Sequence, residues 1–303
     1  MGIIKSNVKV LLDAKARGVS FSNTATLGRL KWYVNEGELN DIISHYHIDI
    51  SVPKETFARN KYSDVFFKEV LGANSLTTID NSSYQGASAT YDLNKPIPSE
   101  MEKRFDVIVD SGTLEHVFNF PTAIANCMKM LKVGGTIFIC TPANNYFGHG
   151  FYQFSPELFF RIFQEENGFE LTRAVILKHP YIGAEMSSCQ KLYKVVDPNT
   201  VHQRVCLVSS TPILLIIEAK RIADKPIFAE YPQQSDYVVV WNKFNEKENT
   251  HGRHKSQKRS LREAVKLFLS NLPTPVRNYI WGAYYRMNYS LWNRKFFKKI
   301  ENV

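Results

Sequence analysis

Short apolar runs separated by turn residues predict buried strands in the first two thirds of the chain. Residues 105–109 and 136–140 are continuous apolar runs rich in β-branched side chains, as expected for strands buried on both faces. Between them, residues 121–131 have the apolar spacing of a helix, and Pro121 suits its first turn. Gly134 and Gly135 predict a turn before the second strand. A strand, a helix and a strand of these lengths predict a parallel crossover unit.

Similar segments alternate on both sides of this unit. Further strands are predicted at residues 24–27, 75–79, 170–176 and 213–219, and further helices at residues 3–17, 38–46, 62–71 and 156–163. Residues 81–104 are rich in Asn, Gly and Pro and are expected to be mostly loop. The alternation predicts an α/β fold with a doubly wound, Rossmann-like, mostly parallel sheet of about seven strands and helices on both faces.

The pattern changes after residue 222. Residues 223–260 lose apolar periodicity and are interpreted as a linker. Two amphipathic helices are predicted at residues 261–269 and 278–297. In the second, large aromatic side chains recur at three- and four-residue spacing, namely Trp281, Tyr285, Tyr289, Trp292 and Phe296. We therefore expect one α/β domain over residues 1–222 with an insertion at about 30–60, then the linker, then a helical tail over residues 261–303.

Charge separates the same two regions. Residues 251–303 hold 12 of the 38 Lys and Arg residues and 2 of the 29 Asp and Glu residues, a balance of +10 that leaves −1 for residues 1–250. A nearly neutral main domain argues against a nucleic-acid substrate. The basic, aromatic tail fits three roles: packing against the protein itself or a protein partner, contact with an anionic membrane, or binding of nucleic acid. Peripheral membrane docking or protein docking is the expectation for residues 261–303.

Composition favours a cytoplasmic protein. No apolar run approaches the roughly 20 residues that a membrane-spanning helix needs, and the first residues contain no apolar signal core. The cysteines show no paired spacing and are expected to be buried thiols in a reducing compartment: Cys127, Cys140, Cys189 and Cys206. Because the histidines also lack ligand spacing, the sequence predicts no metal site.

Two motifs of the crossover unit resemble those of class I S-adenosylmethionine-dependent methyltransferases. The string Phe105-Asp-Val-Ile-Val-Asp-Ser-Gly-Thr-Leu-Glu-His116 resembles the motif of the family's fourth strand. The string Met130-Leu-Lys-Val-Gly-Gly-Thr-Ile-Phe-Ile139 resembles the turn into its fifth strand. The resemblance covers roughly residues 20–222 and excludes the tail. It implies S-adenosylmethionine as cofactor and methyl transfer as the reaction.

The resemblance also assigns cofactor contacts to residues at strand ends. Asp80, after the second strand of the core, is implied to bind the ribose hydroxyls, since one carboxylate can accept from both; a turn-forming role is the alternative. Asp92 is implied to contact the adenine, although Asp is also a common turn residue. Asp110, Ser111 and Gly112, at the end of the fourth strand, complete the implied set.

The first motif departs from the family's pattern. The family has a glycine-rich loop after the first strand, where glycines let the backbone approach the cofactor. Here the segment Thr24-Ala-Thr-Leu-Gly28-Arg29-Leu30 has one glycine and no preceding acid. The Arg29 guanidinium can pair with the cofactor carboxylate or block the pocket. The alternative function is therefore a non-catalytic scaffold that has lost the cofactor and docks through its basic tail.

Two histidines are candidate bases for methyl transfer. His116 follows the fourth strand, and an imidazole with a near-neutral pKa suits proton transfer; hydrogen bonding at the start of a helix is the alternative role. His149 lies between two glycines in the aromatic loop after the fifth strand. The acceptor is expected to contact Asn144, Asn145 and Tyr152. The resemblance favours a small-molecule or glycan-precursor hydroxyl as that acceptor.

Overall fold

The computed structural model describes residues 2–181, 190–249 and 268–300. The chain divides into two compact units. The larger unit comprises Met1–Val195, Ser210–Pro232 and Lys299–Val303, and the smaller unit comprises Val196–Ser209 and Gln233–Lys298.

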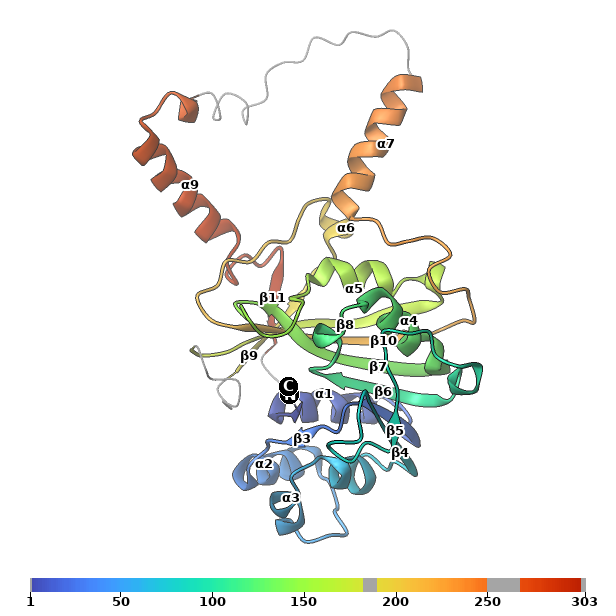
Figure 1. The fold of residues 1–303 in the computed structure, drawn as a ribbon. Helices are drawn as coiled ribbons and strands as arrows, with labels where there is room; N and C mark the ends of the chain where they lie inside the picture. Colours follow the sequence, from blue (N-terminus) through green and yellow to red (C-terminus); the bar gives the residue numbers. More distant parts are fainter. Residues whose placement is uncertain (1, 182–189, 250–267, 301–303) are drawn as a thin grey trace. The chain divides into compact units, whose positions relative to one another are not determined.

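The larger unit is built on one mixed sheet (Figure 1). Its strands are β2 (Asn23–Leu27), β4 (Ser75–Asp80), β5 (Ala89–Thr90), β6 (Phe105–Ser111), β7 (Leu131–Asn144), β8 (Phe169–Lys178), β9 (Lys191–Val195) and β10 (Ile213–Arg221). Their spatial order is β9-β8-β10-β7-β6-β2-β4-β5, and β11 (Phe297–Ile300) continues it beyond β9. The five strands from β7 to β5 pair in parallel, whereas β10 runs antiparallel to both β7 and β8.

The predicted strands are confirmed, but the sheet has nine strands where about seven were expected. The additional strands β5, β9 and β11 lie toward the two sides of the sheet and are two, five and four residues long, which is too short for a clear apolar pattern. The turn predicted at Gly134 and Gly135 is wrong, because β7 runs through both residues. The register between β6 and β7 shifts between the pairs Phe105–Leu131 and Val107–Thr136, so both glycines lie within an irregularity in the pairing.

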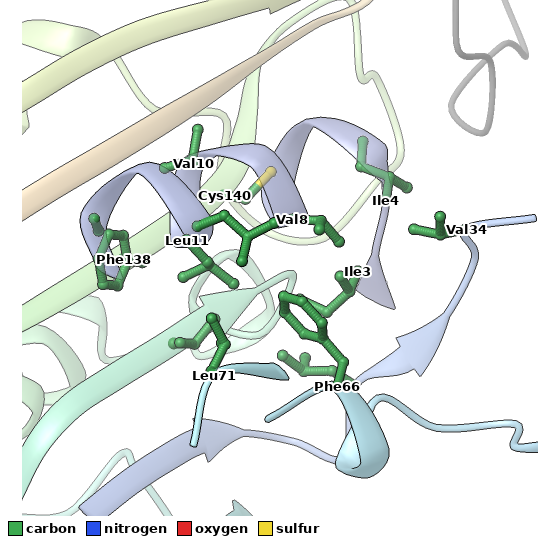
Figure 2. Close-up of a cluster of buried hydrophobic side chains, with 14 of the residues drawn as sticks. Ile3, Ile4, Val8, Val10, Leu11, Val34, Phe66, Leu71, Phe138 and Cys140 are labelled. Carbon is green, nitrogen blue, oxygen red and sulfur yellow. The ribbon is translucent and has the colours of Figure 1, made fainter. Parts of the chain in front are cut away.

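Helices cover both faces of the sheet (Figure 1). They are α1 (Lys5–Ala16) on one face and α4 (Phe120–Met130) and α5 (Pro156–Ile162) on the other. Figure 2 shows Val8 and Leu11 of α1 beside Phe138 and Cys140 of β7, all of them buried. Burying an apolar side chain of this size stabilises the folded state by about 1.5–3 kcal/mol. The apolar stripe of α1 therefore fixes this helix on the sheet.

The predicted insertion between β2 and β4 forms a layer of its own. It contains β3 (Lys31–Trp32), which pairs with β1 (Gly2–Ile3), and the helices α2 (Glu36–Tyr46) and α3 (Glu55–Arg59). The α2 N-terminus is a capping box, in which the Asn35 side chain accepts from the Glu38 amide and the Glu38 carboxylate accepts from the Asn35 amide. Of the helix predicted at residues 62–71, residues 64–70 are helical, and Phe66–Val70 within them is π-helical.

The smaller unit contains the helices α6 (Pro198–Val201), α7 (Ser235–Asn249) and α9 (Thr274–Asn288). Because α7 lies inside the segment 223–260 that was interpreted as a linker, part of that segment is helical. The helix predicted at residues 261–269 falls almost entirely outside the described residues. The helix predicted at residues 278–297 ends at Asn288, where Ser290 and Asn293 bond to backbone carbonyls of the last turn. Among the described helices, none is long and apolar enough to cross a membrane.

Candidate functional site

The strand order reverses between β2 and β6. From β2 the chain moves outward to β4 and β5, and it then returns to β6 and β7 on the other side of β2. In open α/β sheets, ligands bind beyond the carboxyl ends of the strands at such a switch point. The carboxyl ends of β2, β4 and β6 lead into Gly28, Asp80 and Ser111, so these residues mark the expected ligand position.

Gly28 allows the ends of three strands to come close together. Its φ of +72° lies in the left-handed region, and its amide donates to the Ile79 carbonyl at 2.6 Å. A Cβ at this position would lie 3.4 Å from Thr113 Oγ1 and 3.8 Å from Asp80 Oδ2. Asp80 Oδ1 accepts from the Asn81 amide at 2.7 Å. A half-buried carboxylate therefore lies beside a glycine at the switch point.

Arg29 is engaged by neighbouring segments. Its guanidinium pairs with Asp64 Oδ2 at 3.2 Å, lies 4.2 Å from the centre of the Tyr62 ring and donates to the Gln85 carbonyl at 3.3 Å. Arg29 thus connects the inserted segment to the loop after β4. Pairing of Arg29 with a cofactor carboxylate stays a prediction.

The contacts of Asp92 are those of a turn residue. Its Oδ1 accepts from the Asn94 amide at 3.0 Å and from the Asn94 side chain at 2.8 Å. These bonds lower the pKa of Asp92, and Lys95, 3.7 Å away, adds to the effect. Asn94 also accepts from the Asn119 amide at 2.8 Å, which joins this turn to the start of α4.

Asp110 and Ser111 are covered by the first residues of the chain. Ser111 Oγ donates to the Gly2 carbonyl at 2.9 Å. Asp110 is 1% exposed, and its Oδ1 accepts from the Thr113 amide at 2.9 Å. It lines a cavity of about 10 Å³ beneath α1, together with Asn7, Leu11 and Cys140. Burial, followed by the nearby Glu115 carboxylate, raises the pKa of Asp110 well above its usual range. A ligand that touched Asp110 or Ser111 would therefore have to displace β1 and α1.

A second group of polar side chains lies at the ends of β6 and β7. Glu115 is fully buried, and its Oε2 accepts from Thr141 Oγ1 at 3.1 Å. Its Oε1 lies 3.7 Å from His149 Nε2, and the rings of His116 and His149 are 5.2 Å apart. Burial raises the pKa of Glu115 to about 7. The pKa of His116 is lowered, by burial and then by His149. The fold thus brings both candidate bases together around one buried carboxyl group.

The loop after β7 is held against Glu115. The amides of Phe151 and Tyr152 both donate to the Glu115 carbonyl, at 2.8 and 3.2 Å. A Cβ at Gly150, where φ is +76°, would lie 2.8 Å from that carbonyl oxygen and 3.1 Å from His116 Nδ1. Only glycine permits this approach, so Gly150 determines how closely the loop packs beside the histidines.

The predicted acceptor residues mainly hold this loop in place. Asn145 donates to the Thr211 carbonyl at 3.0 Å, and the Tyr152 hydroxyl donates to the Phe118 carbonyl at 2.6 Å. The rings of Phe147 and Phe151, from the aromatic loop noted in the sequence, are solvent-exposed, and so is the ring of Phe118, which the sequence analysis did not single out. Phe118 and Phe151 meet edge to face at 6.0 Å. Their signal was the density of aromatic residues directly after β6 and β7. The sequence analysis also missed Glu115 as the centre of the cluster.

The sequence matches no protein-family model and no curated protein. Solved structures similar to the chain include a Burkholderia thailandensis 1,6-didemethyltoxoflavin-N1-methyltransferase (11% identity, 72% of this chain and 78% of that chain, TM-score 0.37). Another is a possible histamine N-methyltransferase from Thermotoga maritima (13% identity, 71% of this chain and 89% of that chain, TM-score 0.36). A third is a putative methyltransferase from Bacillus halodurans (11% identity, 72% of this chain and 100% of that chain, TM-score 0.36). Similarity at this level does not establish membership of a family. The strand order and the strand-end residues of this chain therefore carry the functional assignment.

Proposed function

We propose that the chain is a class I methyltransferase that uses S-adenosylmethionine. The observation that carries the proposal is the Asp80 carboxylate beside Gly28 at the switch point of the sheet. The order of the sheet supports it, because Gly28 and Asp80 lie at the carboxyl ends of neighbouring parallel strands where the strand order reverses, which is where open α/β sheets bind ligands. The residues fit the cofactor: Gly28 leaves open the space that a Cβ would fill, and Asp80 offers a carboxylate to a pair of ribose hydroxyls.

The chain's own residues supply positioning and proton transfer. Bound at the switch point, S-adenosylmethionine supplies an electrophilic methyl group. Thr113 Oγ1 donates to the Leu27 carbonyl at 2.9 Å and joins the cofactor side to the loop that contains Glu115. On the acceptor side, His149 takes the proton of the acceptor hydroxyl, and Glu115 orients its ring and balances the imidazolium charge. A neutral hydroxyl is thereby converted into a better nucleophile while positioning supplies most of the rate.

The acceptor side is suited to a small molecule with a ring. The exposed faces of Phe118, Phe147 and Phe151 provide apolar surface next to the histidines. A sugar or an aromatic ring that stacks on this surface can present a hydroxyl to His149. We therefore propose a small-molecule or glycan-precursor hydroxyl as the methyl acceptor.

The test is calorimetric titration of the purified chain with S-adenosylmethionine and with its demethylated product. The proposal predicts saturable binding of both. Absence of binding at millimolar cofactor would refute it. It would favour instead the non-catalytic scaffold, for which the specific observation is the burial of Asp110 and Ser111 beneath the first residues of the chain.

We further propose that the basic tail attaches the protein to an acidic surface, either an anionic membrane or a protein partner. The rings of Trp281, Tyr285 and Tyr289 follow one line of α9, stacking at 5.9 and 5.4 Å. Trp292 is 91% exposed, next to Arg294 and Lys295. Exposed aromatics beside basic residues fit a membrane–water boundary. Wild-type protein should sediment with anionic vesicles at low salt and not with neutral ones, and Trp292→Ala should weaken this. If the wild type never sediments, a protein partner is the better assignment.

A further inference from the structure

The cluster of Glu115, His116 and His149 has the composition of a metal site. One ligand atom from each of the three residues lies within 4.8 Å of the other two. The sequence predicts no such site, because His116 and His149 are 33 positions apart and follow different strands. The parallel pairing of β6 with β7 brings the segments after these strands to the same edge of the sheet. The site is therefore a product of the fold and has no spacing signature.

One oxygen of the buried Glu115 carboxylate has no hydrogen-bond partner among the described residues. Glu115 Oε2 accepts from Thr141 Oγ1, but Oε1 is buried and accepts no hydrogen bond from the residues that the structure describes. A buried polar atom left in this way destabilises the protein, and more so when it is charged. This oxygen is directed toward His149, since Nε2 of that ring lies 3.7 Å away. A cation placed between them would be bound by this oxygen and by the His149 ring.

The surrounding backbone holds the three ligands in place. Two amides of the loop after β7 donate to the Glu115 carbonyl, and Gly150 packs against both that carbonyl and the His116 ring. The Thr141 hydroxyl fixes the other carboxylate oxygen. Outer contacts of this kind orient metal ligands and tune the metal. The cluster is thus a preformed arrangement, and small side-chain rotations would bring the ligand atoms to coordination distance.

We propose that Glu115, His116 and His149 bind a divalent transition-metal ion. Two imidazoles and one carboxylate suit Zn²⁺, Fe²⁺ or Co²⁺ better than Mg²⁺ or Ca²⁺, which prefer oxygen ligands. Three protein ligands leave coordination positions open on the side of the partly exposed histidines. With the metal bound, His149 would be a ligand and not the base, and the metal would activate an acceptor hydroxyl instead by lowering its pKa. This consequence rests on the proposed methyl transfer, whereas metal binding itself does not.

The test is calorimetric titration of the full, tag-free chain, stripped with a chelator, with Zn²⁺ alone, and the visible spectrum of the Co²⁺ form. We expect about one ion per chain. His116→Ala and His149→Ala should each weaken binding roughly 10-fold or more. Glu115→Gln, which keeps the size of the side chain, should do the same. His45→Ala, which removes an exposed histidine on α2, is the matched control and should bind like the wild type.

Thermal unfolding and circular dichroism of each variant separate loss of a ligand from loss of the fold. The proposal is overturned if neither ion binds the wild type at micromolar to millimolar concentration. Binding that His116→Ala and His149→Ala both leave unchanged would overturn it equally. A wild type that binds Zn²⁺ but not S-adenosylmethionine would uphold the metal site and refute the proposed methyl transfer, so the two failures are distinguishable.

Discussion

Replacing Asp80 tests the cofactor side of the site with a calculable effect. Its Oδ1 is held by the Asn81 amide, and its Oδ2 faces the space beside Gly28. Asp80→Ala removes a charged acceptor for two ribose hydroxyls, and hydrogen bonds to a charged group contribute about 1.5–3 kcal/mol. Because every 1.4 kcal/mol is a factor of ten, the dissociation constant of the demethylated cofactor should rise about 12- to 140-fold. Asp80→Asn keeps one acceptor oxygen, so its dissociation constant should lie between those of the wild type and Asp80→Ala.

The assay is calorimetric titration of wild type and variants under one buffer condition. Asp41→Asn is the control, since it removes the same charge from an exposed carboxylate that pairs with Lys5. It should leave the affinity unchanged. If Asp80→Ala binds as tightly as the wild type while remaining folded, the ribose does not contact this carboxylate and the reasoning fails.

Three further changes test other parts of the structure. Gly28→Ala puts a side chain at a φ of +72° and should cost about 1–2 kcal/mol of unfolding free energy in urea; an unchanged midpoint would contradict the strain. His149→Ala should lower kcat about 10²- to 10⁴-fold with the acceptor and leave cofactor affinity unchanged; an unaltered rate would exclude it as the base. Although burial raises the pKa of Asp106, hydrogen bonds from Lys132 and Asn23 outweigh this and lower it. Its stabilisation is therefore present above the unfolded pKa of about 3.9 and is lost as pH falls through the lower folded value. Asp106→Asn should lose about 1 kcal/mol or less at pH 7, and its difference from the wild type should vanish in acid; a constant difference would refute the ion pair.

Much of the fold is predictable because long buried strands leave a strong pattern. The runs at β6, β7 and β10 are continuous and apolar, and the helices between strands keep their periodicity. The elements that the sequence did not predict correctly are short or locally irregular. The two residues of β5 carry no pattern, and the glycine pair of β7 has the composition of a turn but lies within a strand. In α7, charged residues interrupt the apolar spacing and hide the helix.

The site was predictable only where a strand end decides the position. Asp80 and Gly28 could be placed because the carboxyl ends of parallel strands share one edge. The contact between His149 and Glu115 could not be predicted, because it depends on the pairing of β6 with β7, which brings the segments after these strands together. Burial of Asp110 under α1 was equally hidden, since nothing in the strand motif shows which segment covers it. Long-range packing, and not local propensity, determines these contacts.

A crystal structure of the full chain with bound S-adenosylhomocysteine would show whether the cofactor lies at the switch point of the sheet. We expect the ligand at the carboxyl ends of β2 and β4, with its ribose hydroxyls at hydrogen-bond distance from the Asp80 carboxylate. The ligand should also lie close to the backbone of Gly28. The acceptor side, with His149 and Glu115, should lie open next to the sulfur. A ligand bound elsewhere, or crystals that remain free of it at saturating concentration while α1 still covers Asp110, would contradict the account.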